Sequence, residues 1–209
     1  MNSKSGTLFI IAAPSGAGKT SLVKALIEQV DNMDVSISYT TRKPRQDEKH
    51  GEAYFFVDEN EFRELINKNH FIEYAKVFEN YYGTPKDWVE KEMLTGRNFI
   101  LEIDWQGAQQ VKSQLRGSVG IFILPPDYHT LRERLVGRQN DDPETIDRRM
   151  GAACEEISHY KDFDYIVINE DFERALAEIK AIITATNLGS CRQKSFYGNF
   201  VRQIMAQND

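Results

Sequence analysis

The stretch Gly-Ala-Gly-Lys-Thr near the start of the chain combines the groups that hold nucleotide phosphates in many proteins. Gly16 and Gly18 allow backbone torsion angles and a close approach that a side chain would block. The Lys19 ammonium can reach terminal phosphates, and the Thr20 hydroxyl can ligate Mg²⁺. An apolar run precedes this stretch and an amphipathic run follows it, which predicts a phosphate-binding loop between a strand and a helix. The general pattern G-x-x-x-x-G-K-[ST] would begin with glycine where this chain has Ala13.

A GTP-dependent switch is one class of protein that such a loop allows. The apolar run FILEIDWQG contains Asp104 and Gly107 at the spacing of the DxxG turn of GTPases. A GTPase also carries an N-K-x-D motif for base recognition after that turn. The chain's one Asn-Lys pair, Asn67-Lys68, precedes the turn and lacks the acid. The sequence therefore disfavours a switch.

A kinase needs a second phosphate site that faces the first, because its chemistry consists mostly of positioning and charge neutralisation. Arg42 and Arg45 flank a proline just after an expected strand, and Tyr54 lies downstream. Guanidinium groups give paired donors to a phosphate, and a tyrosine hydroxyl adds a neutral donor. Arg134 and Arg138 share one helix face, a spacing at which like charges repel unless an anion joins them. These two clusters favour a phosphotransferase.

Composition and charge argue against several classes of binding partner and cellular location. The 209 residues carry a formal net charge of −6, which argues against binding of nucleic acid polymers. No window approaches the roughly 18 apolar residues of a membrane span, so we expect no membrane association. The polar N-terminus lacks a signal-peptide pattern, and we expect a cytoplasmic protein. Cys154 has apolar neighbours at helical spacing and is predicted to be a buried thiol; with Cys191 it forms no metal-binding pattern.

Short apolar runs alternate with helical patterns, which predicts an α/β fold with a parallel sheet. The runs expected to be strands are Thr7–Ala12, Val35–Tyr39, Phe99–Ile103, Val119–Leu124 and Tyr165–Ile168. Helix starts are expected at Asp58 and at the Thr84-Pro85 and Asp142-Pro143 pairs, and Gly96 is expected to end a helix. Two apolar stripes are expected in the core: Ile146, Met150, Ala153, Ile157; and Phe172, Leu176, Ile179, Ile183.

Eight motifs, taken together, make the chain resemble the guanylate kinase family. They are APSGAGKT, SYTTRKPR, HGEAYFF, FIEYAKVFENYYGT, LEIDWQGAQQV, IFILPP, RERLVGR and DYIVIN, and they span most of residues 7–187. The resemblance implies a three-layer P-loop NTPase core (residues 5–37, 98–128 and 150–187) within one domain of residues 1–209. It also implies an inserted GMP-binding lobe at about 38–97 and a helical lid at about 129–149. The C-terminal tail, 188–209, is expected to be a frayed surface helix that packs on a second copy in a possible homo-oligomer.

The resemblance implies an enzyme that converts ATP and GMP to ADP and GDP and that also accepts dGMP. It places Mg²⁺ at Thr20. It places the ATP site at Ser15, Gly16, Ala17, Gly18, Lys19, Thr20, Ser21 and Asn169. It places the GMP site at Ser38, Arg42, Arg45, Tyr54, Glu73, Tyr82, Thr84, Glu102 and Asp104. The groups implied to act on the transferred phosphoryl are Lys19, Arg42, Arg134, Arg138 and Arg149. Glu102 stands where some family members have Asp, so its charge is kept but displaced by one methylene.

Base chemistry supports guanine on its own account. Guanine presents two adjacent donors, N1–H and its amino group, whereas adenine presents an acceptor and a C–H at the same edge. A carboxylate such as Glu73 pairs with guanine and would face a lone pair on adenine. Two alternatives stay open at this point: a kinase of this fold for another small phosphorylated acceptor, and a non-catalytic binding module that keeps the fold.

Overall fold

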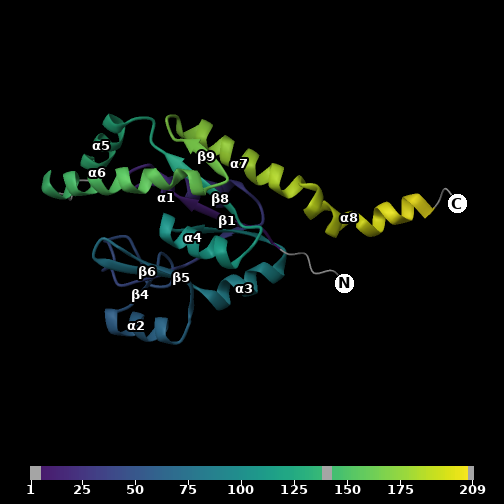
Figure 1. Ribbon diagram of the computed structural model, residues 1–209, viewed down its shortest axis with the longest axis horizontal. Coiled ribbons are helices and arrows are strands. Elements are labelled where there is room, and N and C mark those ends of the chain that lie inside the picture. The colour runs from purple at the N-terminus through teal and green to yellow at the C-terminus, as the bar shows by residue number, and fades with distance from the viewer. Residues whose placement is uncertain (1–5, 138–142, 207–209) are drawn as a thin grey trace.

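Five apolar segments pair into one parallel sheet in the order β2-β7-β1-β8-β9 (Figure 1). The computed structural model describes residues 6–137 and 143–206. The strands are β1 (Leu8–Ala12), β2 (Met33–Val35), β7 (Asn98–Glu102), β8 (Val119–Leu124) and β9 (Tyr165–Ile168). Every residue of β1 is buried, as expected of a central strand that is covered on both faces.

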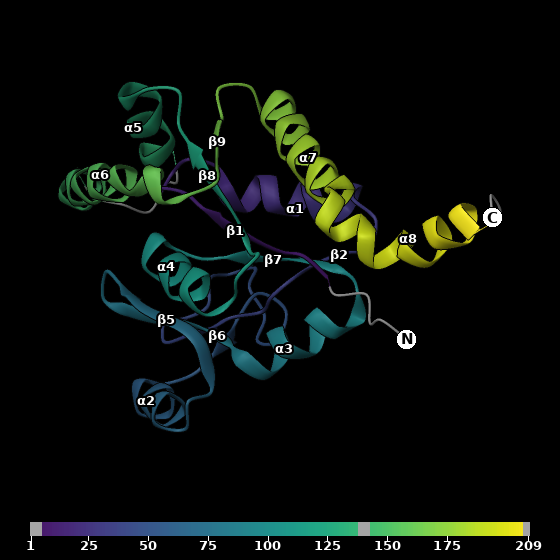
Figure 2. The same ribbon diagram turned by 45° about the vertical axis from the view of Figure 1, so that its right-hand side comes forward.

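Helices cover both faces of this sheet and make three layers (Figure 2). Successive residues of β1 point to opposite faces, so Phe9 and Ile11 pack in one cluster and Leu8 and Ile10 in the other. The first cluster includes α1 (Lys19–Gln29) and α7 (Phe172–Leu188). The second includes α3 (Lys86–Thr95) and α4 (Trp105–Gln114). The predicted three-layer α/β core is therefore confirmed.

A second sheet, in the order β4-β3-β6-β5, lies on the far side of α4 (Figure 2). It consists of β3 (Tyr39–Thr40), β4 (Phe55–Phe56), β5 (Phe71–Val77) and β6 (Asn80–Pro85), and α2 (Glu59–Asn67) packs on it. Ile72 of β5 joins the cluster of α3 and α4, which fixes this sheet against the core.

The remaining helices lie at the two ends of the molecule (Figure 1). α5 (Tyr128–Val136) and α6 (Pro143–Ser158) pack on each other through Leu131, Leu135 and Met150, and a 3₁₀ turn, η1 (His159–Asp162), follows. α8 (Ser190–Met205) continues beyond α7 away from the body. Within the described ranges, none of the helices has both the length and the apolar character needed to cross a lipid bilayer.

Three local predictions were wrong. The run Val35–Tyr39 is not one strand: β2 ends at Val35, and β3 begins at Tyr39 in the other sheet. An apolar pattern shows that a segment is extended but not which strand it pairs with. Thr84 does not cap α3, because it lies in β6 and the cap residue is Pro85. Cys154 is exposed, because the neighbouring Ala153 takes the core-facing position of α6.

Other local predictions were confirmed. Asp58 caps α2 by accepting a hydrogen bond from the Glu61 amide, and Gly96 ends α3 with a left-handed φ of 76°. Most of the two predicted stripes is buried, with Ile157 and Phe172 partly exposed. Residues Ser190–Met205 of the predicted tail form the helix α8. Asp142 lies outside the described residues.

Candidate functional site

The predicted phosphate loop connects β1 to α1 at the carboxyl edge of the parallel sheet. Gly16 and Gly18 have φ values of 93° and 91°, which are costly for any residue with a side chain. The Ala17 amide donates to the Pro14 carbonyl at 3.1 Å and closes the turn. The amides at the start of α1 therefore form a concave, positively polarised seat, as an anion site requires.

Residues from distant parts of the chain hold this loop from behind. Asn169, which follows β9 and is buried, donates from Nδ2 to the Ala17 carbonyl at 2.7 Å. Arg134 of α5 donates in turn to the Asn169 carbonyl at 2.9 Å. The predicted ATP-site residue Asn169 thus lies against the loop, and Arg134 lies against Asn169. Of the described residues, Asn169 Oδ1 and Arg134 Nη1 are among the buried polar atoms that lack a hydrogen-bond partner.

A polar pocket lies where the second sheet meets α4. The Thr84 hydroxyl donates to Glu73 Oε1, and the Ser38 and Thr84 hydroxyl oxygens are 3.3 Å apart. Because the one proton of Thr84 goes to Glu73, Ser38 is the donor in the second contact. Asp104 caps α4 beside them by accepting from the Gly107 amide at 2.9 Å. Four of the predicted base and ribose contacts therefore lie together.

One buried carboxylate, that of Glu73, and two half-buried ones, those of Asp104 and Glu156, lie within electrostatic reach of Lys19. The pKa of Glu73 is raised to about 7: burial and, to a smaller extent, the Asp104 charge raise it, while the Thr84 hydrogen bond and Lys19 oppose the shift. Burial also raises the pKa values of Asp104 and Glu156, again opposed by Lys19. The Lys19 ammonium donates to the Ile103 carbonyl at 3.0 Å. The phosphate-loop lysine and the buried acid of the second sheet thus share one site.

A cationic cluster lies on the second sheet. Arg42 Nη2 binds Glu48 Oε1 at 2.8 Å, and its guanidinium lies 5.5 Å from the centre of the Tyr54 ring. Glu48 also accepts from the Arg45 amide at 2.9 Å, whereas the Arg45 side chain is exposed. The Tyr54 and Tyr82 rings meet edge to face. Burial raises the pKa of Tyr54, so its hydroxyl stays a neutral donor.

Glu102 lies on the phosphate-loop side of the site. The Thr20 hydroxyl donates to Glu102 Oε1, and the Glu102 charge also reaches Tyr54. A hydroxyl and a carboxylate side by side are oxygen ligands of the kind that Mg²⁺ accepts from a protein when phosphates and water supply the others. No cluster of three or more potential metal-ligating side chains occurs in residues 6–137 or 143–206. The pair fits an ion that arrives with a nucleotide.

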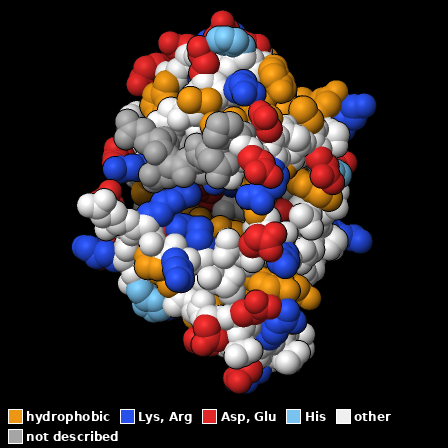
Figure 3. All heavy atoms as spheres, turned by 90° about the vertical axis from the view of Figure 1, so that its left-hand side faces the viewer, with side chains coloured by type: hydrophobic (Ala, Val, Ile, Leu, Met, Phe, Trp, Pro, Cys, Tyr) orange, Lys and Arg blue, Asp and Glu red, His pale blue; other side chains and the backbone are white. Residues whose placement is uncertain are grey.

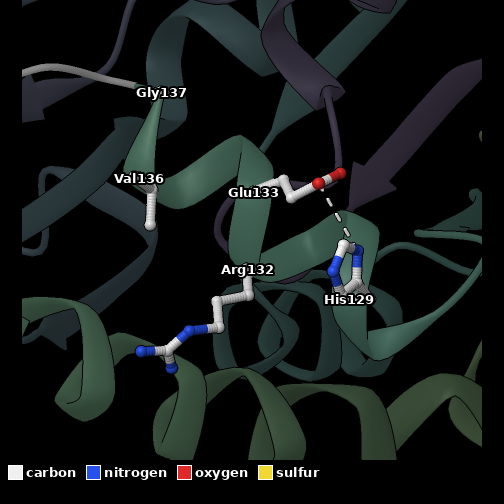
Figure 4. Close-up of a pocket in the computed structure, with 5 residues that line it drawn as sticks. All are labelled: His129, Arg132, Glu133, Val136 and Gly137. Carbon is white, nitrogen blue, oxygen red and sulfur yellow. Dashed lines mark ion pairs between the residues drawn. The ribbon is translucent and has the colours of Figure 1, made fainter.

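The surface of the molecule is hollowed in several places. Figure 3 shows Lys and Arg side chains around a hollow on the face that corresponds to the left-hand side of Figure 1. A cavity of about 140 Å³ lies between β5, α4 and α6, and Phe78, Asp104 and Glu156 are in its lining. A larger hollow of about 380 Å³ on α5 is lined by His129, Arg132, Glu133, Val136 and Gly137 (Figure 4). No predicted site residue lines the α5 hollow.

The structure describes two of the three predicted lid arginines. Arg134 turns inward to Asn169, and Arg149 of α6 is half-buried. Arg138 lies outside the described residues, so its pairing with Arg134 stays a prediction. A different arginine, Arg132, joins α5 to α6 through an ion pair with Asp147 at 3.0 Å.

Residues 5–186 match a family model described as guanylate kinase. The chain belongs to the guanylate kinase family. It is 47% identical to a guanylate kinase of Escherichia coli O157:H7 over 203 residues, which cover 96% of this chain and 98% of that protein. It is 49% identical to a guanylate kinase of Alcanivorax borkumensis over 202 residues, covering 97% and 98%. A crystal structure of guanylate kinase from Anaplasma phagocytophilum superposes with a TM-score of 0.77 at 35% identity, covering 90% of each chain.

Membership of the guanylate kinase family makes the chain an enzyme of that type and confirms the predicted phosphotransferase. It also gives the DxxG sequence a plain explanation. Asp104 and Gly107 are the cap residue and third residue of a helix, joined by a side chain–backbone hydrogen bond. The pattern is a helix start in this kinase and not a switch.

Two residues at the site were not singled out from the sequence: Glu48 holds Arg42, and Glu156 accepts a hydrogen bond from the Ser15 amide at 3.0 Å. Gly107 was noted only as part of the DxxG pattern, and its position against Glu73 was not predicted. Glu48 lies in a charged stretch where any acid reads as a surface residue. Glu156 is 141 positions from its partner, and no local pattern indicates such a contact.

Proposed function

We propose that this protein transfers the γ-phosphoryl group of ATP to GMP, giving ADP and GDP, and that it also accepts dGMP. The observation that carries the proposal is the shared site of Glu73 and Lys19. A buried acid able to read a base lies within electrostatic reach of the lysine of a phosphate loop. The family membership supports the same reaction.

The proposed guanine site is the pocket of Ser38, Glu73, Thr84 and Asp104. Glu73 offers acceptors to the guanine N1–H and amino group, and Thr84 holds one of its oxygens in place. Adenine at the same position would bring a lone pair toward the carboxylate. A site built to bond such groups rejects an analogue that lacks them by about 10⁴.

The proposed GMP phosphate site is the cluster of Arg42, Arg45, Tyr54 and Tyr82. Arg42 is held by Glu48 and by the aromatic rings beneath it, so little side-chain entropy remains to be lost on binding. Arg45 is exposed, and its guanidinium forms a longer ion pair with the same Glu48, at 3.9 Å. We expect Arg45 to exchange this contact for the GMP phosphate, while Arg42 provides an oriented guanidinium.

The proposed ATP phosphate site is the loop from Ser15 to Ser21. Its amides donate hydrogen bonds to the phosphate oxygens, and Lys19 leaves the Ile103 carbonyl to contact the phosphoryl group being transferred. Thr20 and Glu102 would hold Mg²⁺, which neutralises phosphate charge when it is bound. Asn169, with a buried oxygen that lacks a partner among the described residues, suits a contact with the amino group of adenine.

Transfer in this arrangement requires in-line positioning and little covalent chemistry from the protein. The acceptor phosphate is held on the second sheet and the donor phosphate on the loop. Arg134, Arg138 and Arg149 are proposed to close over both from the lid at about 129–149. Arg134 must leave the Asn169 carbonyl to do so.

The division into core, lobe at about 38–97 and lid stays a proposal. The separate sheet β3–β6 supports the lobe, although Val89 of α3 packs with the core strands. A homo-oligomer through α8 also stays a prediction, supported by exposed Tyr197, Phe200, Val201 and Ile204. The cytoplasmic location and the lack of binding to nucleic acid polymers and membranes stay predictions as well.

The test is a coupled ADP-release assay with Mg-ATP and five acceptors: GMP, dGMP, AMP, UMP and CMP. We expect strong turnover with GMP and weaker turnover with dGMP. Lys19→Ala serves as the inactive control for background ATPase activity. Turnover with a different acceptor and none with GMP would contradict the proposal.

A further inference from the structure

Two side chains from remote segments form hydrogen bonds with the backbone of the phosphate loop. Asn169 donates to the Ala17 carbonyl, and Glu156 of α6 accepts from the Ser15 amide at 3.0 Å. A methyl group at Gly18 would lie 2.4 Å from Asn169 Nδ2, so the Asn169 contact is tight. Asn169 belongs to the core, whereas Glu156 belongs to the helix pair α5–α6.

Glu156 and its neighbour Glu155 both line the 140 Å³ cavity, but only Glu156 is partly withdrawn from solvent. Glu156 is half-buried, lines the 140 Å³ cavity with Asp104, and lies within electrostatic reach of Lys19. Glu155, one position earlier on α6, is exposed. Arg149 lies seven residues before Glu156, two helical turns away on the same face. One face of α6 therefore presents both a loop contact and an arginine that is proposed to reach phosphates.

A carboxylate in this position is costly unless it has a specific partner. Withdrawing an acid from water disfavours its charge, and the charges of Asp104 and Glu155 increase that cost for Glu156, while Lys19 offsets part of it. The Ser15 amide is the partner that the structure provides. A loop with two left-handed glycines is intrinsically flexible, so a charge-assisted hydrogen bond at its entrance restricts it.

We propose that Glu156 is a positioning residue for the ATP phosphates: it fixes the entrance of the loop through the Ser15 amide and couples that entrance to α6. This rests on the proposed function, in which the loop binds ATP. The contrasting possibility is that the carboxylate competes with the incoming phosphates for the amide. The two differ in sign, because loss of a positioning contact weakens ATP binding and loss of a competitor strengthens it.

The kinetic test compares Glu156→Ala with Glu156→Gln. A hydrogen bond to a charged group is worth about a tenfold change or more in binding, so we expect the alanine variant to raise KM for ATP about tenfold. KM for GMP should change less than twofold. Glutamine keeps an oxygen acceptor for the Ser15 amide and should recover most of the loss. Glu173→Ala, which removes an exposed acid of α7 that does not line the cavity, should leave both KM values unchanged.

The direct test is amide hydrogen exchange at Ser15, followed by NMR in the nucleotide-free protein. We expect the Ser15 amide to be protected in the wild type and in Glu156→Gln, and to exchange at least tenfold faster in Glu156→Ala. This measurement does not depend on which nucleotide binds, so it separates failure of this inference from failure of the proposed function. Unchanged exchange at Ser15, or tighter ATP binding by Glu156→Ala, would overturn the positioning role. GMP affinity by calorimetry checks that the alanine variant is folded.

Discussion

Gly107 of α4 lies directly against the carboxylate of Glu73. A methyl group at residue 107 would stand 2.5 Å from Glu73 Oε2 and 3.1 Å from its carboxyl carbon, closer than Cβ atoms approach in proteins. The same glycine donates its amide to Asp104. The absence of a side chain at residue 107 therefore lets α4 and β5 bring two acids together at the proposed base site.

Gly107→Ala should damage GMP recognition selectively. The new methyl group must push Glu73 away from its bond with Thr84, and misplacement of a reacting or recognising group by about 1 Å costs on the order of 100-fold. We expect kcat/KM for GMP to fall at least tenfold, with KM for ATP within twofold of the wild type. Gly198→Ala is the matched control, because it is also helical and has no neighbouring atom within 4 Å. Equal losses for both substrates would argue against the specific contact.

Affinity for GMP should depend on pH through Glu73. Its pKa of about 7 means that the carboxylate is protonated below neutral pH and then cannot accept both guanine donors. Titration calorimetry from pH 6 to 8.5 should show GMP binding strengthen as the pH rises through 7. The phosphate of GMP also titrates in this range, so Glu73→Gln is the reference: it should bind GMP weakly and lose the part of the pH dependence due to Glu73.

The same group makes a prediction about stability. A carboxyl with a folded pKa of about 7 and an ordinary unfolded value holds its proton more tightly when folded, so the folded state loses stability as the pH rises from about 4.5 to 7. The loss amounts to about 3 kcal/mol at most. Glu73→Gln should therefore melt above the wild type at pH 8.5, and the difference should shrink toward pH 5. A difference in Tm that does not vary with pH would show that this carboxyl does not titrate as described.

We expect Glu48 to support binding of the GMP phosphate, although it is an acidic residue beside the proposed anion site. It fixes Arg42 through a 2.8 Å ion pair and holds the Arg45 amide. Glu48→Ala should raise KM for GMP several-fold, because Arg42 then loses its orientation, and should leave KM for ATP unchanged. Glu52→Ala is the control, since Glu52 forms an exposed ion pair with Lys49 at 3.5 Å. Tighter GMP binding by Glu48→Ala would show that the acid opposes the substrate.

Gly18→Ala should abolish binding at the phosphate loop. Alanine at a φ of 91° costs about 1–2 kcal/mol, and its methyl group would also displace Asn169. We expect affinity for ATP to fall at least 100-fold while affinity for GMP is kept. Gly117→Ala is the control for a left-handed glycine outside the phosphate loop, because Gly117 has a φ of 94° and a methyl group added there would meet no atom within 4 Å. If both variants bound ATP equally well, neither the backbone strain in the loop nor the Asn169 contact would affect binding.

The sequence predicts this fold well wherever one local signal decides an element. The phosphate loop is such a case, as is the Asp58 cap. It fails where two segments compete for one residue: Thr84 has the side chain of a helix cap, but β6 extends through it and its hydroxyl serves Glu73. The contacts of Gly107 and Glu156 depend on packing between distant elements. Local patterns in a single sequence do not reveal which elements pack together. Family resemblance supplied Glu73, which would otherwise read as a surface acid.

The methyl groups of Leu131 and Leu135 form the wall behind Gly16, where an added carbon would lie 3.0 and 3.1 Å from them. A rotation of α5 would therefore change the packing behind the phosphate loop. We expect movement of the proposed lid to be coupled to the shape of the proposed ATP phosphate site. Among related sequences, we expect a larger residue at position 16 to occur only together with smaller residues at position 131 or 135.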